Sequence, residues 1–148
     1  MSKGSEAAFA TTIRVRDACL CLHTQRAARA LGRRFDEALR PHGITSGQFS
    51  LLMSLNRPEP PNMGAVAGLL AMDRTTLTAA VKPLERRGLL AVGVDPADKR
   101  GRLLTLTSAG RSVLARAVPI WERTHAAVES LLEGTDPDAL RRSLRTLS

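Results

Sequence analysis

Residues 73–110, DRTTLTAAVKPLERRGLLAVGVDPADKRGRLLTLTSAG, decide the fold of this chain. Asp73 is suited to cap the N-terminus of a helix, and apolar residues recur after it at helical spacing. Two apolar runs follow, residues 89–94 and residues 102–106, separated by a basic segment. A second helix is expected to begin near Ser108. The stretch therefore predicts a helix, a β-hairpin with a basic tip, and a further helix.

The helix after Asp73 is predicted to have an apolar face and a polar face. Each residue advances about 100° around a helix, so Val81 and Leu84 fall within about 40° of Leu77 and face the core. The opposite face carries threonines and then cations, which suit DNA base edges and phosphates respectively. A solvated polar face without a ligand is the alternative. The side chains expected to contact DNA from this helix are Arg74, Thr75, Thr76, Thr78, Lys82 and Arg86.

The tip of the predicted hairpin concentrates positive charge. Lys99, Arg100 and Arg102 lie within four positions, and Gly101 permits a turn between the strands. An arginine held on a hairpin can enter a narrow minor groove, where the negative potential is concentrated. We expect Asp98 to orient the guanidinium of Arg100 through a salt bridge. A solvated loop whose charges serve only solubility is the alternative.

Two further helices are predicted upstream of Asp73. Thr45 and Gln48 form a T-x-x-Q capping box, so one helix begins at Thr45. Another begins near Asn62, and a link of three or four residues separates it from the next helix, as in a helix-turn-helix. With the hairpin, these helices predict a winged helix-turn-helix over residues 45–107. The apolar face of the helix after Asn62 is expected to consist of Val66, Leu69 and Leu70.

Long helices are predicted on both sides of this region. One covers residues 12–40, and residues 108–148 form a long helix and a short one. The helix over residues 12–40 is longer than a small core requires, so we expect it to pack against another long helix, such as one from a second subunit. Residues 1–11 are expected to form a flexible tail before a single domain, residues 12–148. The predicted fold class is mainly α with a small β-hairpin wing.

The composition narrows the classes of function. The 148 residues suit one domain, and 22 basic against 14 acidic residues give a net charge of +8. This charge alone does not identify a partner, because a basic protein can also bind RNA or a membrane surface, and an arginine-rich composition can arise without any anionic partner. Only 3% of residues are aromatic and none is tyrosine, which disfavours binders of RNA or single strands that stack bases. No run of residues is long and apolar enough to span a membrane, and the N-terminus does not resemble a signal peptide. We therefore expect a cytoplasmic protein with no membrane partner.

The sequence contains no motif that predicts catalysis. A nucleophile elbow, a phosphate-binding loop, an H-E-x-x-H motif and paired carboxylates on one face are all missing. The three histidines and two cysteines do not have the spacing of a zinc site. Two cysteines are also too few for a disulfide framework. We therefore expect no enzyme activity, no cofactor and no metal.

The order of these elements resembles the MarR family of winged-helix transcriptional regulators. The resemblance covers about residues 18–132, and Asp98 and Arg100 match the aspartate and arginine of the family's wing. It implies a homodimer held by the helices of residues 12–40 and 108–148. It also implies binding to a pseudo-palindromic site in double-stranded DNA, as a repressor or activator that is released by a small ligand or by oxidation. A non-specific DNA-binding or partner-binding module on the same fold is the alternative. The motifs that carry the resemblance are GITSGQFSLLMSL (residues 43–55), ERRGLL (85–90), DKRGRLLTLT (98–107) and LTSAG (106–110).

Cys21 is a candidate redox sensor. It lies where the hydroperoxide-sensing branch of the family carries a reactive cysteine, although the tyrosines of that branch are replaced here by Gln25 and Ser46. A small buried apolar residue is the alternative role for this cysteine. In an intact helix Cys19 and Cys21 point about 200° apart and cannot bond to each other. A redox switch would then need a bond between subunits or a small-thiol adduct.

The resemblance also implies an effector pocket between the dimerisation helices and the DNA-binding region. An arginine with a histidine could hold a carboxylate, and Trp121 could stack on an aromatic ring. A surface or interface role for each histidine is the alternative, as is a DNA binder without any effector. The candidate pocket residues are Arg16, His23, Phe49, Met53, Trp121 and His125.

Overall fold

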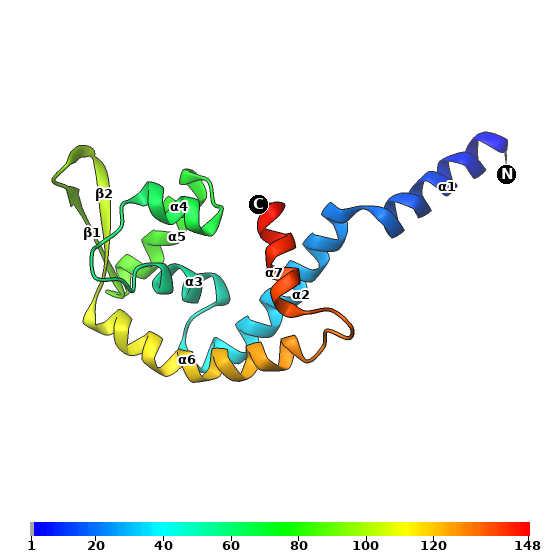
Figure 1. Cartoon of the computed structure of the whole chain (residues 1–148). Helices are drawn as coiled ribbons and strands as arrows, with labels where there is room; N and C mark the ends of the chain where they lie inside the picture. The colour runs from blue at the N-terminus through cyan, green and yellow to red at the C-terminus, as the bar shows by residue number, and fades with distance from the viewer. Residues whose placement is uncertain (1) are drawn as a thin grey trace. The chain divides into compact units, whose positions relative to one another are not determined.

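The computed structural model describes residues 2–148 (Figure 1). It is mainly helical with one two-stranded antiparallel sheet, which confirms the predicted fold class. The chain divides into two compact units, Met1–Arg34 and Phe35–Ser148. Met1, which belongs to the predicted tail, lies outside the described residues. Within the described range, no helix combines the length and the apolar character needed to cross a bilayer.

The first unit contains helix α1, Lys3–Ala18, and most of helix α2, Leu20–Leu39. The structure thus differs from the prediction of a flexible tail over residues 1–11 and one helix over residues 12–40. Helix α1 begins early because the alanine-rich residues around Phe9 favour a helix. Cys19 separates the two helices with φ −72° and ψ 110°, which is an extended conformation. No glycine or proline lies beside Cys19 to predict this break. None of the side chains of α1 is buried.

Two helices of the second unit begin at Thr45 and Asn62, as the sequence predicts. The capping box of Thr45 and Gln48 is present, with both hydrogen bonds 3.1 Å long. Asn62 accepts a hydrogen bond from the amide of Ala65 at 2.8 Å and caps the following helix. The helices are η1 (Arg40–His42), α3 (Ser46–Ser54), α4 (Met63–Leu70), α5 (Arg74–Arg86), α6 (Ser108–Glu129) and α7 (Pro137–Thr146).

The hairpin has a tighter tip than the sequence predicts. Strand β1, Leu90–Asp95, pairs with strand β2, Asp98–Leu106, so only two residues connect them. The second strand begins four residues earlier than expected because Asp95 pairs with Asp98, after a register shift between Val94 and Asp95. The amide of Leu104 also donates to the carbonyl of Pro61 at 2.9 Å. This bond fixes the segment before α4 to the hairpin.

The core of the second unit lies between α3, α4, α5, the base of the hairpin and the first half of α6. Leu77, Val81 and Leu84 are buried in it, as the helical spacing predicts. Leu69 is 64% exposed, so its predicted place in the core is wrong. The helix α4 is only eight residues long and buries Met63, Val66 and Ala67 instead, a face rotated away from Leu69.

Candidate nucleic-acid interface

Helix α5 presents a polar face to solvent opposite its buried leucines and valine. Arg74, Thr75, Thr76, Thr78, Lys82 and Arg86, the predicted DNA-contacting side chains of this helix, are all exposed. Arg74, Thr75, Thr78 and Lys82 line one open concavity of about 360 Å³ together with Ala79. The helical wheel therefore located these side chains correctly, and the structure brings four of the six into a single surface.

The threonines of α5 are not equivalent as hydrogen-bonding groups. The hydroxyl of Thr76 donates to Asp73 at 2.8 Å, and the hydroxyl of Thr78 donates to the carbonyl of Arg74 at 2.7 Å. Each of these oxygens retains lone pairs that can accept a hydrogen bond from a base. The hydroxyl of Thr75 has no partner within the described chain and can donate as well as accept.

Asp73 holds the N-terminus of α5 in place. One carboxylate oxygen accepts from the amide of Thr76 at 2.7 Å, and the other accepts from the hydroxyl of the same residue. The amide of Thr76, followed by its hydroxyl, lowers the pKa of Asp73 below the ordinary value for aspartate. The cap therefore stays charged over a wider range of acidic pH and fixes the start of the DNA-facing surface.

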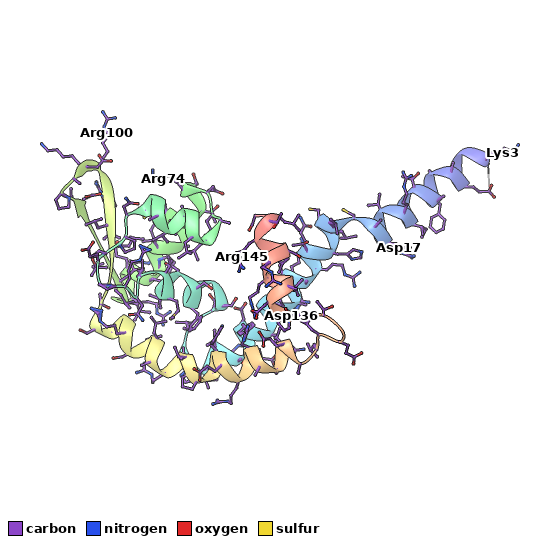
Figure 2. The ribbon with its side chains drawn as sticks, in the orientation of Figure 1. Lys3, Asp17, Arg74, Arg100, Asp136 and Arg145 are labelled. Carbon is purple, nitrogen blue, oxygen red and sulfur yellow. The ribbon has the colours of Figure 1, made fainter. Side chains whose placement is uncertain are left out.

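Lys99, Arg100 and Arg102 are exposed on the hairpin. Arg100 extends into solvent at its tip (Figure 2). The predicted salt bridge between Asp98 and Arg100 is not among the ion pairs of residues 2–148. Asp98 accepts instead from the backbone amide of Arg100, at 3.0 Å. It orients the backbone of the strand and leaves the guanidinium free within the described chain.

The base of the hairpin tip and the start of α5 meet at a polar concavity of about 180 Å³. Arg74 from the helix and Arg102 from strand β2 line it, together with Asp95 and Asp98. Arg102 donates to the carbonyl of Gly101 at 3.0 Å, and Lys99 is exposed beside it. The sequence placed Arg74 and Arg102 on separate elements, and only the folded chain brings them to one hollow.

Comparison with known proteins agrees with this geometry. The model of the MarR family matches residues 44–101. The crystal structure of the M. tuberculosis transcriptional regulator MosR in complex with DNA is 38% identical, covers 87% of this chain and 92% of MosR, and superposes with a TM-score of 0.79. This chain belongs to the MarR family. It is therefore a DNA-binding transcriptional regulator and not an enzyme.

Two further relatives of this MarR-family chain differ in their roles. The transcriptional repressor CouR, bound to a 23-mer DNA duplex, is 30% identical, covers 90% of this chain and 94% of CouR, and has a TM-score of 0.77. The transcriptional activatory protein BadR of Rhodopseudomonas palustris is 36% identical over 89 residues, 58% of this chain. That match spans about half of BadR, 51% of its length.

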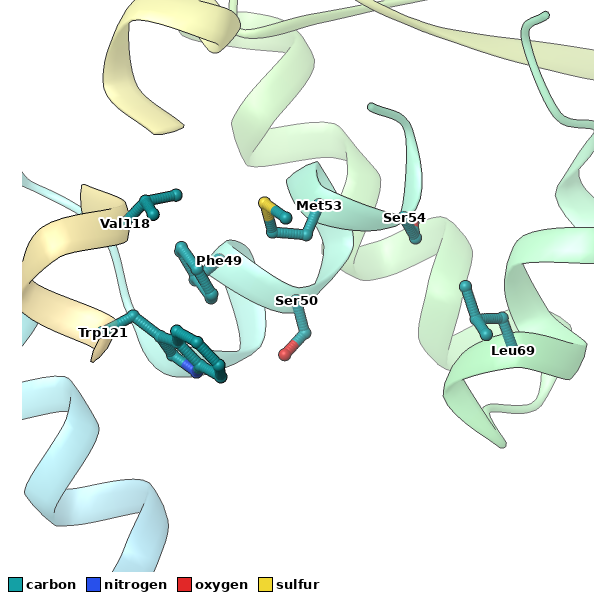
Figure 3. Close-up of a pocket in the computed structure, with 7 residues that line it drawn as sticks. All are labelled: Phe49, Ser50, Met53, Ser54, Leu69, Val118 and Trp121. Carbon is teal, nitrogen blue, oxygen red and sulfur yellow. The ribbon is translucent and has the colours of Figure 1, made fainter. Parts of the chain in front are cut away.

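A pocket of about 400 Å³ lies in the second unit of this MarR-family chain (Figure 3). It contains three of the predicted effector-pocket residues, Phe49, Met53 and Trp121. The rings of Phe49 and Trp121 stack with centroids 6.3 Å apart, and Trp121 stacks in turn on the predicted residue His125 at 4.7 Å. The remaining lining residues, which sequence reasoning missed, are Ser50, Ser54, Leu69 and Val118.

The other two predicted pocket residues, Arg16 and His23, belong to the first unit. Arg16 pairs there with the carboxylate of Asp17 at 2.7 Å, and Nε2 of His23 lies 3.0 Å from the carbonyl oxygen of Asp17. The pair with Arg16 lowers the pKa of Asp17. Both candidate cationic groups therefore have local partners of their own.

The two cysteines are free. Cys21 is exposed. The alternative role of a small buried apolar residue is therefore not seen for Cys21 within its own unit. Its sulfur accepts from Nε2 of Gln25 at 3.5 Å. Cys19 is half-buried at the break between α1 and α2.

Proposed function

We propose that this regulator is a sequence-specific repressor that binds a pseudo-palindromic operator as a homodimer. The observation that carries the proposal is the single exposed surface formed by Arg74, Thr75, Thr78 and Lys82 on α5. Threonines at the start of the helix suit base edges in the major groove, and Lys82 suits a phosphate. Arg86, Lys99 and Arg102 would add phosphate contacts, and Thr76 would contribute mainly by holding the cap.

The wing is proposed to contact the flanking DNA. Arg100 stands at the tip of the hairpin with its guanidinium free, and the bond from its amide to Asp98 holds the backbone beneath it. A free guanidinium on a rigid hairpin suits a narrow minor groove. The supporting role of Asp98 is therefore exerted through the backbone of Arg100.

A homodimer is proposed because apolar side chains at the ends of the chain lack cover. Phe9 and Leu20 are exposed on α1 and α2, and Leu131, Leu144 and Leu147 are exposed near the C-terminus. A second copy is the partner that would bury such residues symmetrically. Two α5 helices spaced by about 34 Å would enter successive major grooves, and one module alone contacts too few base pairs for useful affinity.

Repression is the proposed sign of regulation, as for the relative CouR. A dimer that covers a promoter excludes the polymerase and represses transcription. The relative BadR is an activator. The sign of regulation therefore depends on where the operator lies relative to the promoter. Operator binding also implies that the protein works in the cytoplasm, beside the chromosome.

The pocket is proposed to bind an uncharged, planar aromatic effector. None of its seven lining residues carries a charge, and Phe49, Met53 and Trp121 offer apolar walls. Ser50 supplies a hydroxyl without a partner in the described chain. A carboxylate would lie among these walls without a cation to pair with, which is costly. A carboxylate effector is the competing class, and its candidate partners Arg16 and His23 lie in the first unit. Oxidation at Cys21 is a separate proposed route to release.

Footprinting on the DNA beside the gene for this protein tests the proposal. A regulator protects a defined pseudo-palindrome, and protection requires the dimer. Uniform protection that grows with the length of the DNA would favour the alternative of a non-specific module. The matched control is the Lys82→Ala variant, which should keep the fold because Lys82 is exposed. Its protection of the DNA should be weaker, because Lys82 is proposed to contact a phosphate.

A further inference from the structure

Arg74 lies between two hollows of the DNA-facing surface. On one side it lines the open concavity of about 360 Å³ together with Thr75, Thr78 and Lys82. On the other side it lines the polar hollow of about 180 Å³ beneath the hairpin tip, which Arg102 also lines. Two roles are therefore open to Arg74, a contact to a base edge from the first hollow or a contact to a backbone phosphate from the second.

The carboxylates of the polar hollow favour the second role. Asp95 and Asp98 line this hollow together with the two arginines. No ion pair joins either acid to Arg74 or Arg102 among residues 2–148. Opposite charges that face one hollow still attract each other at longer range. This attraction favours a guanidinium of Arg74 that points toward the hairpin and away from the bases that α5 would contact.

Both carboxylates are fixed by the backbone of the hairpin tip. One oxygen of Asp95 accepts from the amide of Ala97 at 2.9 Å, and one oxygen of Asp98 accepts from the amide of Arg100 at 3.0 Å. Gly101 lies against both acids, since a Cβ atom on Gly101 would stand 3.3 Å from Cβ of Asp95 and 3.3 Å from the carbonyl oxygen of Asp98. The negative charges therefore keep their places, and Gly101 adds no side chain that would fill the hollow.

The guanidinium of Arg102 is held at the same place. Its Nη1 donates to the carbonyl of Gly101 at 3.0 Å, and a guanidinium has further N–H donors that this bond leaves for a ligand. The guanidinium of Arg74 has no hydrogen-bonding partner within the described residues. Two cations at one hollow repel each other, and the two carboxylates offset that repulsion. The free protein thus brings two guanidiniums to one hollow before a ligand binds.

We propose that Arg74 and Arg102 clamp one and the same phosphate of the DNA backbone, at the edge of the groove that α5 enters. A guanidinium donates to the non-bridging oxygens of a phosphate in a fork, and two guanidiniums can do so from two sides. Two arginines and two aspartates leave the hollow without net formal charge. The attraction of an anion therefore comes from the exposed cations around it, which are Lys82, Lys99 and Arg100.

A shared phosphate would couple the wing to the DNA-reading helix. Arg74 belongs to α5 and Arg102 to strand β2, so one phosphate fixes both elements on the same point of the backbone. Phosphate contacts position a protein on the duplex and carry no sequence information. Arg74 would thus set the register of α5, while Thr75 and Thr78 contact the bases. This assignment rests on the DNA interface proposed above.

The salt dependence of operator binding tests whether the phosphate is shared. Each neutralised phosphate contributes about 0.9 to the slope of the logarithm of affinity against the logarithm of salt concentration. The double variant Arg74→Ala/Arg102→Ala should lose about 0.9 for each operator half-site, because only one phosphate is released. A loss of about 1.8, as for two separate phosphates, or no loss at all would overturn the inference.

The matched control is the double variant Arg74→Ala/Arg100→Ala. It removes the same charge, but Arg100 extends from the hairpin tip and does not line the hollow. Its losses should add to about 1.8 for each half-site. Arg74, Arg100 and Arg102 are all exposed, so each variant should fold.

Neutral methylphosphonate linkages, placed one at a time along the operator, locate the contact. The wild-type protein should lose affinity when the clamped phosphate is neutralised. Arg74→Ala and Arg102→Ala should each become less sensitive to neutralisation, and at the same linkage. Different linkages for the two variants would overturn the inference. So would a changed preference of Arg74→Ala at one base pair, because only a base contact depends on sequence.

The same measurements separate this inference from the proposed function. If footprinting finds no defined operator, the proposed function fails, and salt slopes on any duplex of fixed length still decide whether Arg74 and Arg102 share a phosphate. If a defined operator is protected but the two arginines act at different linkages, the inference fails and the proposed function stands.

Discussion

Gly110 lies against Leu89 so closely that a Cβ atom on Gly110 would stand 2.1 Å from the carbonyl oxygen of Leu89. Thr107 completes the same junction, since its hydroxyl donates to the carbonyl of Gly88 at 2.6 Å and accepts from the amide of Gly110 at 3.0 Å. The start of helix α6 is therefore fixed to the segment that joins α5 to the hairpin. The orientation of the wing relative to α5 depends on this contact.

Gly110→Ala is expected to destabilise the protein. The added methyl group meets a backbone oxygen, which cannot move aside as a flexible side chain can, and overpacking of this kind costs about 3 kcal/mol. The measurement is the free energy of unfolding in urea. Gly68→Ala is the control, because nothing lies within 4 Å of its added methyl group, and alanine should be neutral or favourable in that helix. Equal stability of the two variants would contradict the close contact.

Arg100→Ala is expected to weaken operator binding by the loss of one phosphate or minor-groove contact. The slope of the logarithm of affinity against the logarithm of salt concentration should fall by about one. Arg116→Ala, which removes an equal charge from an exposed position on α6, should leave the slope nearly unchanged. If the affinity of Arg100→Ala were unchanged at several salt concentrations, the wing tip would not contact the operator.

Substitutions on α5 are expected to separate base contacts from phosphate contacts. Lys82→Ala should weaken binding to all sequences alike, whereas Thr78→Ala should change the preference at one base pair by about 1–3 kcal/mol. Titration against a set of single-base operator variants measures both effects. Gel filtration should show the dimer intact in each case. Loss of the dimer in either variant would mean that this face of α5 has been assigned to the wrong partner.

Asp73 is expected to make the stability of α5 dependent on pH. Hydrogen bonds from Thr76 lower the pKa of Asp73 in the folded state, so its contribution is present above the ordinary pKa of aspartate. The contribution is lost as the pH falls through the lowered value. Asp73→Asn keeps a capping side chain that does not titrate, so its melting temperature should fall less steeply on acidification. If the melting temperatures of the two proteins fell equally steeply with pH, this assignment would be contradicted.

The pocket can be followed by fluorescence, because Trp121 is the single tryptophan and the chain has no tyrosine. An uncharged aromatic compound that enters the pocket should quench the emission of Trp121. The matched aromatic carboxylate should bind at least tenfold more weakly, because no lining residue carries a charge. A carboxylate that binds as tightly as the neutral compound would show that Arg16, His23 or His125 serves the ligand after all.

Local sequence signals located the features that depend on neighbouring residues. The caps at Thr45, Asn62 and Asp73 follow from side chains that bond within three residues of themselves. The buried face of α5 follows from helical spacing alone, because a helix of 13 residues has room for a clear period. Leu69 was misplaced because the eight residues of α4 define its inner face poorly.

Features that depend on distant contacts were not predictable. The tip of the hairpin is short because Asp95 pairs with Asp98 after a register shift, and no residue type in the sequence predicts that shift. Asp98 bonds to a backbone amide where its spacing from Arg100 suggested a guanidinium. The break at Cys19 occurs without glycine or proline, and the meeting of Phe49 with Trp121 requires α3 and α6 to pack together.

The most direct test of the central claim is a competition titration of the purified protein on its footprinted operator. The competitor is a DNA fragment of equal length and base composition with a scrambled sequence, and the salt concentration is held constant. Sequence-specific binding through α5 and the wing predicts at least a thousandfold preference for the operator, which Thr78→Ala and Arg100→Ala should reduce. Equal affinity for the two fragments, unaffected by either substitution, would contradict the account.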